Sequence, residues 1–171
     1  GIPFERKGDE ALALPNGTKL DQCYFTEKHV VVQDLSSQQI GTLMCQVQAN
    51  NAPLKVWDCC AASGGKSILA TDIFTSMELT VSDNRSSILA NLHKRFREAG
   101  IRKYHAFESD LSLPLLRKPA YNLVIADVPC TGSGTWGRTP EQLYYFDPHS
   151  IDAMVSLQRK ILDQVQTSLL K

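Results

Sequence analysis

The sequence lacks the features of several large classes of protein. No stretch of its 171 residues approaches the roughly 20 apolar residues that a membrane-spanning helix needs, and no signal-peptide pattern opens the chain. The formal net charge is zero, which argues against a domain that holds nucleic acid by charge alone. We therefore expect a globular protein that does not enter a membrane and is large enough for one hydrophobic core.

Cysteine and histidine are present, but not in the patterns of a disulfide framework or a metal site. The five cysteines are an odd number, and no two of them form a Cys-x-x-Cys pair. The four histidines are scattered without the spacing of metal ligands. Both observations favour reduced thiols, no bound metal and a cytoplasmic protein.

Apolar periodicity predicts an α/β fold. From Pro53 onward, short apolar runs alternate with segments whose apolar residues follow helical spacing. This rhythm is typical of a doubly wound, mostly parallel sheet with right-handed crossovers. Strands are expected at residues 55–58, 79–83, 104–107 and 121–126, and helices at 67–70, 88–99 and from 148 onward.

The residues before Pro53 are expected to lead into this domain. Residues 1–29 are polar and interrupted by prolines and a glycine, so we expect a linker there. A short strand is expected at 30–32, and Asp34 is placed to cap a helix that runs to Val47. The chain would then hold one domain, residues 30–171.

Acidic residues follow three of the expected strands. In parallel sheets a ligand binds beyond the carboxyl ends of the strands. Asp58 ends the first strand, Asp83 ends the second, and Asp110 follows the third. A carboxylate in the place of Asp83 commonly binds the two hydroxyls of a ribose, and one at Asp110 suits an adenine amino group. Together they predict an adenosyl ligand, although Asp83 alone also suits a helix cap and Asp110 a surface turn.

A loop of small residues joins Asp58 to the next helix. Small side chains let the backbone pass close to a ligand, and the loop opens onto the free amides of a helix N-terminus. Gly-Gly-Lys-Ser in this loop is similar to the tail of a P-loop, but the first glycine of that motif would fall at Cys60, which disfavours a phosphate-binding NTPase. The candidate loop residues are Cys60, Ala61, Ala62, Ser63, Gly64, Gly65 and Lys66.

The fourth strand leads directly into Asp127-Val128-Pro129-Cys130. A thiol beside a carboxylate suits chemistry on a pyrimidine ring, because C5 of cytosine becomes nucleophilic once a thiolate adds to C6 and an acid stabilises charge at N3. The alternative is a structural cysteine buried after an ordinary strand. Asp127 and Cys130 are therefore the candidate catalytic residues.

Four motifs between about Val30 and Lys171 resemble those of the Fmu/Sun (RsmB/NSUN-type) family of RNA cytosine-C5 methyltransferases, in the same order. Residues 58–67 are similar to that family's cofactor loop, Asp-x-Cys-Ala-Ala-Pro-Gly-Gly-Lys-Thr. Residues 127–134 resemble its Asp-Ala-Pro-Cys-Ser-Gly-x-Gly, residues 138–141 its Arg-x-Pro-Asp, and residues 32–38 its Val-Gln-Asp-x-Ser-Ala-Gln.

The resemblance implies a Rossmann-like class I methyltransferase fold with S-adenosylmethionine as the methyl donor. It assigns the loop from Cys60 to Lys66 to the methionine end of the cofactor, Asp83 to the ribose and Asp110 to the adenine edge. It also implies that Asp127 lies near the methyl sulfonium and near the target cytosine of a ribosomal RNA.

The sequence departs from the family pattern in three ways. Ser63 stands where the family has proline, and Cys59 stands where it has an aliphatic residue, so we expect Cys59 in the core. The family also uses a second cysteine, the nucleophile of a Thr-Cys motif after a fifth strand, while its Pro-Cys thiol assists release of the product. Because this chain stops at Lys171, we expect a fragment without the last strands and the nucleophile, able to bind cofactor but not to turn over.

Two alternatives stay open at this point. Cys130 would itself be the nucleophile if the chain worked as DNA cytosine-C5 methyltransferases do, or the chain would be a non-catalytic module that binds S-adenosylmethionine or RNA. Basic residues on one expected helix are suited to RNA but more typical of a solvated helix face, and aromatic residues after Cys130 are suited either to RNA bases or to core packing. These are Lys94, Arg95, Arg97, Trp136, Tyr144, Tyr145 and Phe146.

Overall fold

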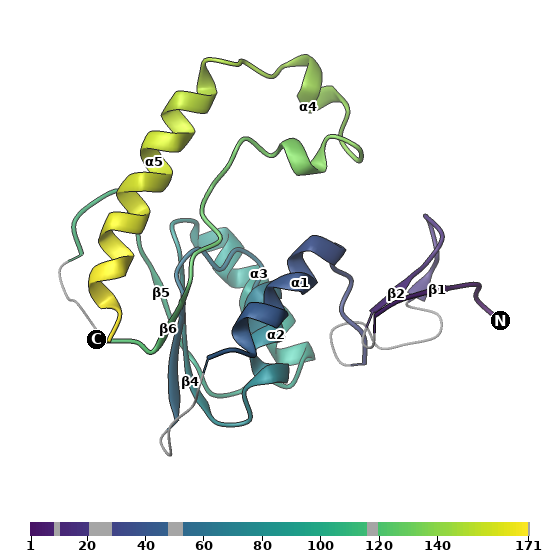
Figure 1. The fold of residues 1–171 in the computed structure, drawn as a ribbon, viewed down its shortest axis with the longest axis horizontal. Helices are drawn as coiled ribbons and strands as arrows, with labels where there is room; N and C mark the ends of the chain where they lie inside the picture. The colour runs from purple at the N-terminus through teal and green to yellow at the C-terminus, as the bar shows by residue number, and fades with distance from the viewer. Residues whose placement is uncertain (9–10, 21–28, 48–52, 116–119, 171) are drawn as a thin grey trace.

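A parallel sheet of four strands forms the centre of the computed structural model (Figure 1). The strands are β3 (Leu54–Asp58), β4 (Met77–Asp83), β5 (His105–Glu108) and β6 (Leu123–Ile125), in the spatial order β5-β4-β3-β6. The chain adds β4 and β5 on one side of β3 and then crosses over to add β6 on the other. The switch point therefore lies between β3 and β6, the place where such sheets bind ligands. The structure describes residues 1–8, 11–20, 29–47, 53–115 and 120–170.

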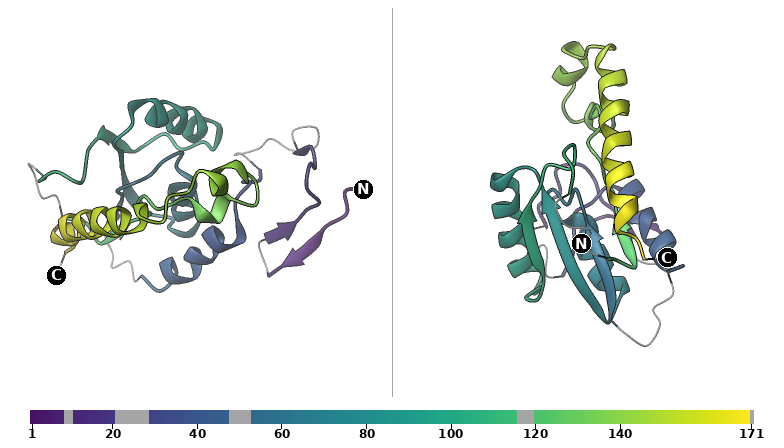
Figure 2. Two further views of the ribbon diagram at one scale, coloured as in Figure 1. Left: turned by 90° about the horizontal axis from the view of Figure 1, so that it is seen from above. Right: turned by 90° about the vertical axis from the view of Figure 1, so that its left-hand side faces the viewer.

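Helices cover both faces of this sheet (Figures 1 and 2). One face packs against α1 (Leu35–Met44), α2 (Gly65–Ile73) and α3 (Ser86–Glu98), and the other against α5 (Ser150–Val165). The two faces hold separate apolar clusters because successive strand residues point to opposite sides. Val56 lies in the cluster with Phe96 of α3, whereas its neighbour Trp57 lies in the cluster with Ile161 of α5.

An arm of the chain, residues 129–149, connects β6 to α5 and extends away from the sheet (Figure 1). It contains a 3₁₀ turn (Ser133–Thr135) and the short helix α4 (Glu141–Tyr144). The rings of Trp136 and Phe146 pack against each other with centroids 4.9 Å apart. Gln158 of α5 donates a hydrogen bond to the carbonyl of Pro129 at 2.8 Å, which ties the start of the arm to the helix.

The structure confirms the expected strands and helices after Pro53, with small shifts at their ends. Gly100 stops α3, because its φ of 79° is a left-handed conformation. The amide of Ile101 then bonds back to the carbonyl of Phe96 at 2.8 Å.

The segment before Pro53 differs from expectation. Where a linker was expected, strands β1 (Glu5–Lys7) and β2 (Ala11–Ala13) form an antiparallel hairpin, while residues 9–10 and 21–28 lie outside the described residues. Residues 30–32, which the structure describes, form no strand. Val30 makes a single β-bridge, and Val31 and Val32 make none. Three consecutive valines are typical of a strand, but a strand also needs a hydrogen-bonded neighbour. The following helix ends at Met44, short of Val47.

No helix in the part of the chain that the structure describes is long and apolar enough to span a bilayer.

Candidate cofactor and catalytic site

The loop between β3 and α2 is fixed by the backbones of the two neighbouring strands. The Cys59 amide donates to the carbonyl of Ile125 at 3.0 Å, and the Ala61 amide donates to that of Ser82 at 2.9 Å. Gly64 then turns the chain into α2 with a φ of 82°. A Cβ at this position would lie 2.4 Å from Cε1 of Phe96, so only glycine fits. The loop is therefore a rigid cradle seated on α3.

Asp58 lies at the floor of this cradle and is almost completely buried. Its Oδ2 accepts a hydrogen bond from the Ser67 hydroxyl at 2.7 Å. Its Oδ1 is buried and makes no hydrogen bond with the described residues. Burial raises the pKa of Asp58 to about 7, although the Ser67 hydrogen bond opposes the shift. An orphaned carboxylate oxygen that lines a pocket is a ready acceptor for a donor group of a ligand.

Asp83, the expected ribose ligand, is buried at the end of β4 and is already engaged. The Ala62 amide donates to its Oδ2 at 3.0 Å, and the Arg85 side chain donates to both carboxylate oxygens, at 2.9 and 3.2 Å. Burial alone would raise the pKa of Asp83, but the hydrogen bonds from Arg85 and Ala62 outweigh it and lower that pKa. Arg85 must therefore release Asp83 before this carboxylate can bind two ribose hydroxyls.

Asp110, the expected adenine ligand, is exposed in a turn after β5. Its Oδ1 accepts a hydrogen bond from the Ser112 amide at 2.9 Å, and hydrogen bonding with the side chain and the backbone of Ser112 lowers the pKa of Asp110. The preceding residue, Ser109, donates its amide to the Asp83 carbonyl at 3.1 Å. The turn is thus tied to Asp83, although Asp110 does not line the pocket described next.

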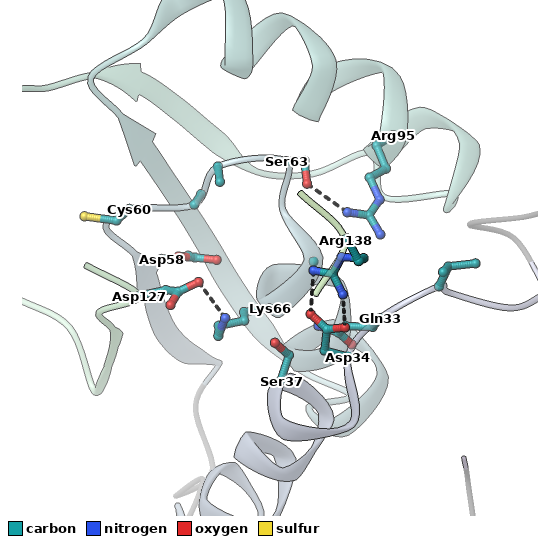
Figure 3. Close-up of a pocket in the computed structure, with 14 residues that line it drawn as sticks. Gln33, Asp34, Ser37, Asp58, Cys60, Ser63, Lys66, Arg95, Asp127 and Arg138 are labelled. Atoms are coloured by element: carbon teal, nitrogen blue, oxygen red, sulfur yellow. Dashed lines mark hydrogen bonds and ion pairs between the residues drawn. The ribbon is translucent and has the colours of Figure 1, made fainter. Parts of the chain in front are cut away.

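A pocket of about 410 Å³ lies between the loop, the entry to α1 and the end of β6 (Figure 3). Lys66 of the loop and Asp127 after β6 form an ion pair in it, with Nζ and Oδ2 2.5 Å apart. The expectation for Lys66 was a contact with the cofactor's methionine end, whereas here its ammonium meets the candidate catalytic carboxylate. The lining residues are Val32, Gln33, Asp34, Ser37, Asp58, Cys60, Ala61, Ala62, Ser63, Gly65, Lys66, Arg95, Asp127 and Arg138.

The two cysteines of the loop differ in their surroundings. Cys59 is buried in the apolar cluster of Trp57, which confirms the expected core position. A hydrogen bond between the two thiols, together with burial, raises the pKa of Cys59. Cys60 is half-buried and lines the pocket, as its place in the loop motif implies.

Cys130 is exposed at the start of the arm and is not among the residues that line the pocket. Its sulfur accepts a hydrogen bond from the Gly132 amide at 3.4 Å. The alternative of a structural cysteine buried after the strand does not hold, because the thiol faces solvent beside the site.

Three residues of the site were not expected there, and two of them, Arg138 and Arg95, line the pocket. Arg138 of the arm binds Asp34 through two hydrogen bonds, Ser67 donates to Asp58, and Arg95 reaches over the loop from α3. Arg138 and Asp34 lie in motifs that the sequence singled out, but nothing in the sequence joins them. Arg95 carries no such signal, because an arginine on an amphipathic helix is ordinarily solvated.

Comparison with known proteins identifies the family. Residues 43–171 match the family described as 16S rRNA methyltransferase RsmB/F. This chain belongs to the RsmB/F family. Its members include the probable ribosomal RNA small subunit methyltransferase B of Synechocystis, 27% identical over 145 residues, which cover 82% of this chain and 31% of the relative. Ribosomal RNA small subunit methyltransferase F of Escherichia coli is 29% identical over 179 residues, 95% of this chain and 33% of the relative. The chain thus spans about a third of the length of these RsmB/F proteins.

Solved structures share the fold of this RsmB/F chain. The structure titled PH0851 superposes with a TM-score of 0.84 at 22% identity and covers 99% of this chain and 39% of its own. NSun6 from Pyrococcus horikoshii, solved with SFG, gives a TM-score of 0.73 at 19% identity and covers 93% of this chain and 39% of its own. These likenesses show a Rossmann-like methyltransferase fold, as expected.

The family is S-adenosylmethionine-dependent, and the residues present fit that cofactor. The glycine-lined cradle, the orphaned Oδ1 of Asp58 and the carboxylates of Asp83 and Asp110 follow one another across the carboxyl ends of β3, β4 and β5. An adenosyl ligand laid along this edge would meet them in the order that the sequence predicted.

Proposed function

We propose that this chain is the cofactor-binding core of an enzyme that methylates C5 of a cytosine in 16S ribosomal RNA. The observation that carries the proposal is the placement of Asp127. It lies two residues after the end of β6, beside the switch point, it is ion-paired to Lys66 of the loop, and Cys130 follows it three residues later. One carboxylate therefore stands between the cofactor cradle and an exposed thiol.

The chemistry assigns separate tasks to these groups. S-adenosylmethionine supplies an electrophilic methyl group when bound. Asp127 steadies the target base by accepting a hydrogen bond from its 4-amino group while a thiolate adds to C6. The addition makes C5 nucleophilic, C5 takes the methyl group, and a base then removes the C5 proton as the carbon–sulfur bond breaks. The carboxylate is held for this task by the Lys66 ammonium.

We propose that Cys130 is the assisting thiol that promotes release of the product. Its exposed position outside the pocket supports this role over direct attack from within the cofactor site. The nucleophile would come from the Thr-Cys motif that the family resemblance implies. Two other outcomes compete with this assignment. In one, Cys130 is itself the nucleophile, and in the other, the chain binds its ligands without catalysing a reaction.

RNA is the proposed partner, and the exposed face of the arm supports it. Tyr144 and Tyr145 are 85% and 80% exposed, and their rings meet edge to face. Exposed aromatic rings beside a catalytic site are platforms for unstacked bases. Trp136 and Phe146 instead pack on each other inside the arm. A target within duplex RNA would have to be flipped out to reach Asp127. We place the protein in the cytoplasm, where it would meet this RNA.

Two measurements on the purified chain test the proposal. Calorimetric titration with S-adenosylhomocysteine should show binding, and absence of binding would overturn the proposal. Incubation with S-adenosylmethionine and RNA containing 5-fluorocytidine then tests the thiols, because such a base traps the covalent adduct. An adduct that Cys130→Ala abolishes would make Cys130 the nucleophile, whereas cofactor binding without an adduct supports the assisting role.

A further inference from the structure

Two adjacent free thiols, those of Cys59 and Cys60, lie where β3 runs into the loop. Cys59 is only 1% exposed and lies in the apolar cluster of Trp57, whereas Cys60 is half-buried and lines the pocket. Figure 3 shows the Cys60 sulfur directed away from the ion pair of Lys66 and Asp127. A solute at the pocket can therefore reach the Cys60 sulfur, while the Cys59 thiol is shielded from it.

The backbone around these two cysteines is held by the neighbouring strands. The Cys59 amide donates to the carbonyl of Ile125 at 3.0 Å, and the Ser82 hydroxyl donates to the carbonyl of Cys59 at 2.9 Å. The Ala61 amide, directly after Cys60, donates to the carbonyl of Ser82 at 2.9 Å. The Cα atoms of adjacent residues are about 3.8 Å apart, closer than the roughly 4.4 Å that a disulfide normally needs. Because the anchored backbone cannot twist to relieve this mismatch, we expect no disulfide between Cys59 and Cys60.

Cys59 acts on Cys60 through a hydrogen bond instead. The Cys59 thiol donates to the Cys60 sulfur, and this bond lowers the pKa of Cys60, although burial and the carboxylates of Asp58, Asp83 and Asp127 oppose the shift. The pKa of the buried Cys59 is raised, so this thiol keeps its proton and remains a donor. The accessible sulfur of the pair is therefore the one that carries the reactive thiolate.

We propose that Cys60 is a site of reversible modification by low-molecular-weight disulfides, and that the attached group closes the pocket. The Cys60 thiolate attacks one sulfur of the disulfide, a new sulfur–sulfur bond forms, and the other half leaves as a thiolate. Cys60 is oxidised and the departing sulfur is reduced, so the exchange needs no further oxidant, and excess free thiol reverses it. Cys59 stands where the family resemblance has an aliphatic residue, so this activation is a property of the present chain.

Closure of the pocket follows from its size. Its volume of about 410 Å³ is near the lower end of the roughly 300–1,000 Å³ of small-molecule sites, so it cannot hold a peptide thiol and a nucleoside together. This consequence rests on the proposed function, because it takes the pocket as part of the S-adenosylmethionine site. The modification of Cys60 itself does not depend on that assignment.

The first experiment measures the rate of modification at each thiol. The whole chain is incubated with oxidised glutathione at neutral pH, and peptide mass spectrometry follows the glutathionyl group. Cys60 should react faster than Cys45, although Cys45 is exposed and Cys60 is half-buried, so exposure alone predicts the opposite order. Equal rates, or a faster Cys45, would overturn the proposal.

The variant Cys59→Val tests the activation of Cys60. Valine keeps an apolar side chain in the cluster but cannot donate to the Cys60 sulfur. The variant should slow modification of Cys60 about threefold or more, since the loss of thiolate is partly offset by its greater nucleophilicity. Cys45 is the internal reference, and a cooperative urea transition shows that the variant is folded. An unchanged rate at Cys60 in the folded variant would mean that Cys59 does not activate it.

The second experiment tests closure of the pocket. Calorimetric titration with S-adenosylhomocysteine should show a number of binding sites that falls in proportion to the modified fraction of Cys60, and dithiothreitol should restore it. Loss that instead follows modification of Cys45 or Cys130, or binding that persists in the modified chain, would overturn closure. If the reduced, unmodified chain binds no S-adenosylhomocysteine, the proposed function fails, while the rates measured by mass spectrometry still decide whether Cys60 is the modification site.

Discussion

Arg138 and Asp34 form a bidentate ion pair across 104 positions of the chain, with nitrogen–oxygen distances of 2.7 and 3.2 Å. Asp34 precedes α1, and Arg138 lies in the arm that follows Cys130. The pair therefore joins the two segments that border the pocket from opposite ends of the sequence (Figure 3). The hydrogen bonds from Arg138 also lower the pKa of Asp34, so the carboxylate stays charged through the neutral range.

Arg138→Ala should loosen the arm without unfolding the protein. Both side chains of the ion pair are more than half exposed, so the stability lost should stay below about 1 kcal/mol in urea denaturation. Trp136, two residues away, should become more accessible to acrylamide quenching, while the buried Trp57 contributes little to the change. The charge swap of Asp34→Arg with Arg138→Asp should restore the original quenching. Equal quenching in all three proteins would show that the pair does not position the arm.

Asp58→Asn should change how stability depends on pH. The folded pKa of about 7 lies above the ordinary value of 3.8, so the folded state holds the proton more tightly than the unfolded state does. The contribution of Asp58 to stability is therefore lost as pH rises from about 4 to about 7. Relative to the unaltered protein, the variant should gain about 1 kcal/mol or more between about pH 5 and about pH 8. Parallel stability curves from urea titrations at these pH values would contradict the buried-carboxyl assignment.

Gly64→Ala should be strongly destabilising. The new methyl group would meet the Phe96 ring at 2.4 Å, and alanine would have to adopt a φ of 82°. Backbone strain and overpacking together should cost at least about 2 kcal/mol in urea denaturation. Gly134→Ala is the matched control, since nothing lies within 4 Å of its built Cβ and its φ is not positive. Similar losses in the two variants would show that the cradle is not seated on α3 as described.

Arg85→Ala should increase affinity for S-adenosylhomocysteine. The arginine side chain is 56% exposed and occupies both oxygens of Asp83, so its removal frees this carboxylate for the ribose role that we propose for it. The gain should be roughly two- to fivefold, because an ion pair with one exposed partner is weak. Arg102→Ala, an exposed arginine outside the site, serves as the control in the same titration. A loss of affinity would mean that Arg85 itself holds the ligand.

The sequence alone determined the order of strands and helices after Pro53 and the carboxylates at the strand ends. Parallel strands present their carboxyl ends at one edge of a sheet, so Asp58, Asp83 and Asp127 had to gather there once the strands were recognised. The loop of small residues followed from the same reasoning. The sequence predicts the strands, the helices and the residues at the strand ends because each depends on a local repeat of apolar residues or on one position at the end of a strand or helix.

Tertiary structure decided which partners these residues have. The pairing of Lys66 with Asp127, the closure of Asp83 by Arg85 and the orphaned Oδ1 of Asp58 depend on the paths of loops that carry no repeat. Arg95 reaches the pocket because of the rotation of α3 about its axis and its packing on the loop. Long charged side chains have many rotamers, so only the packed neighbours select the one that enters the site.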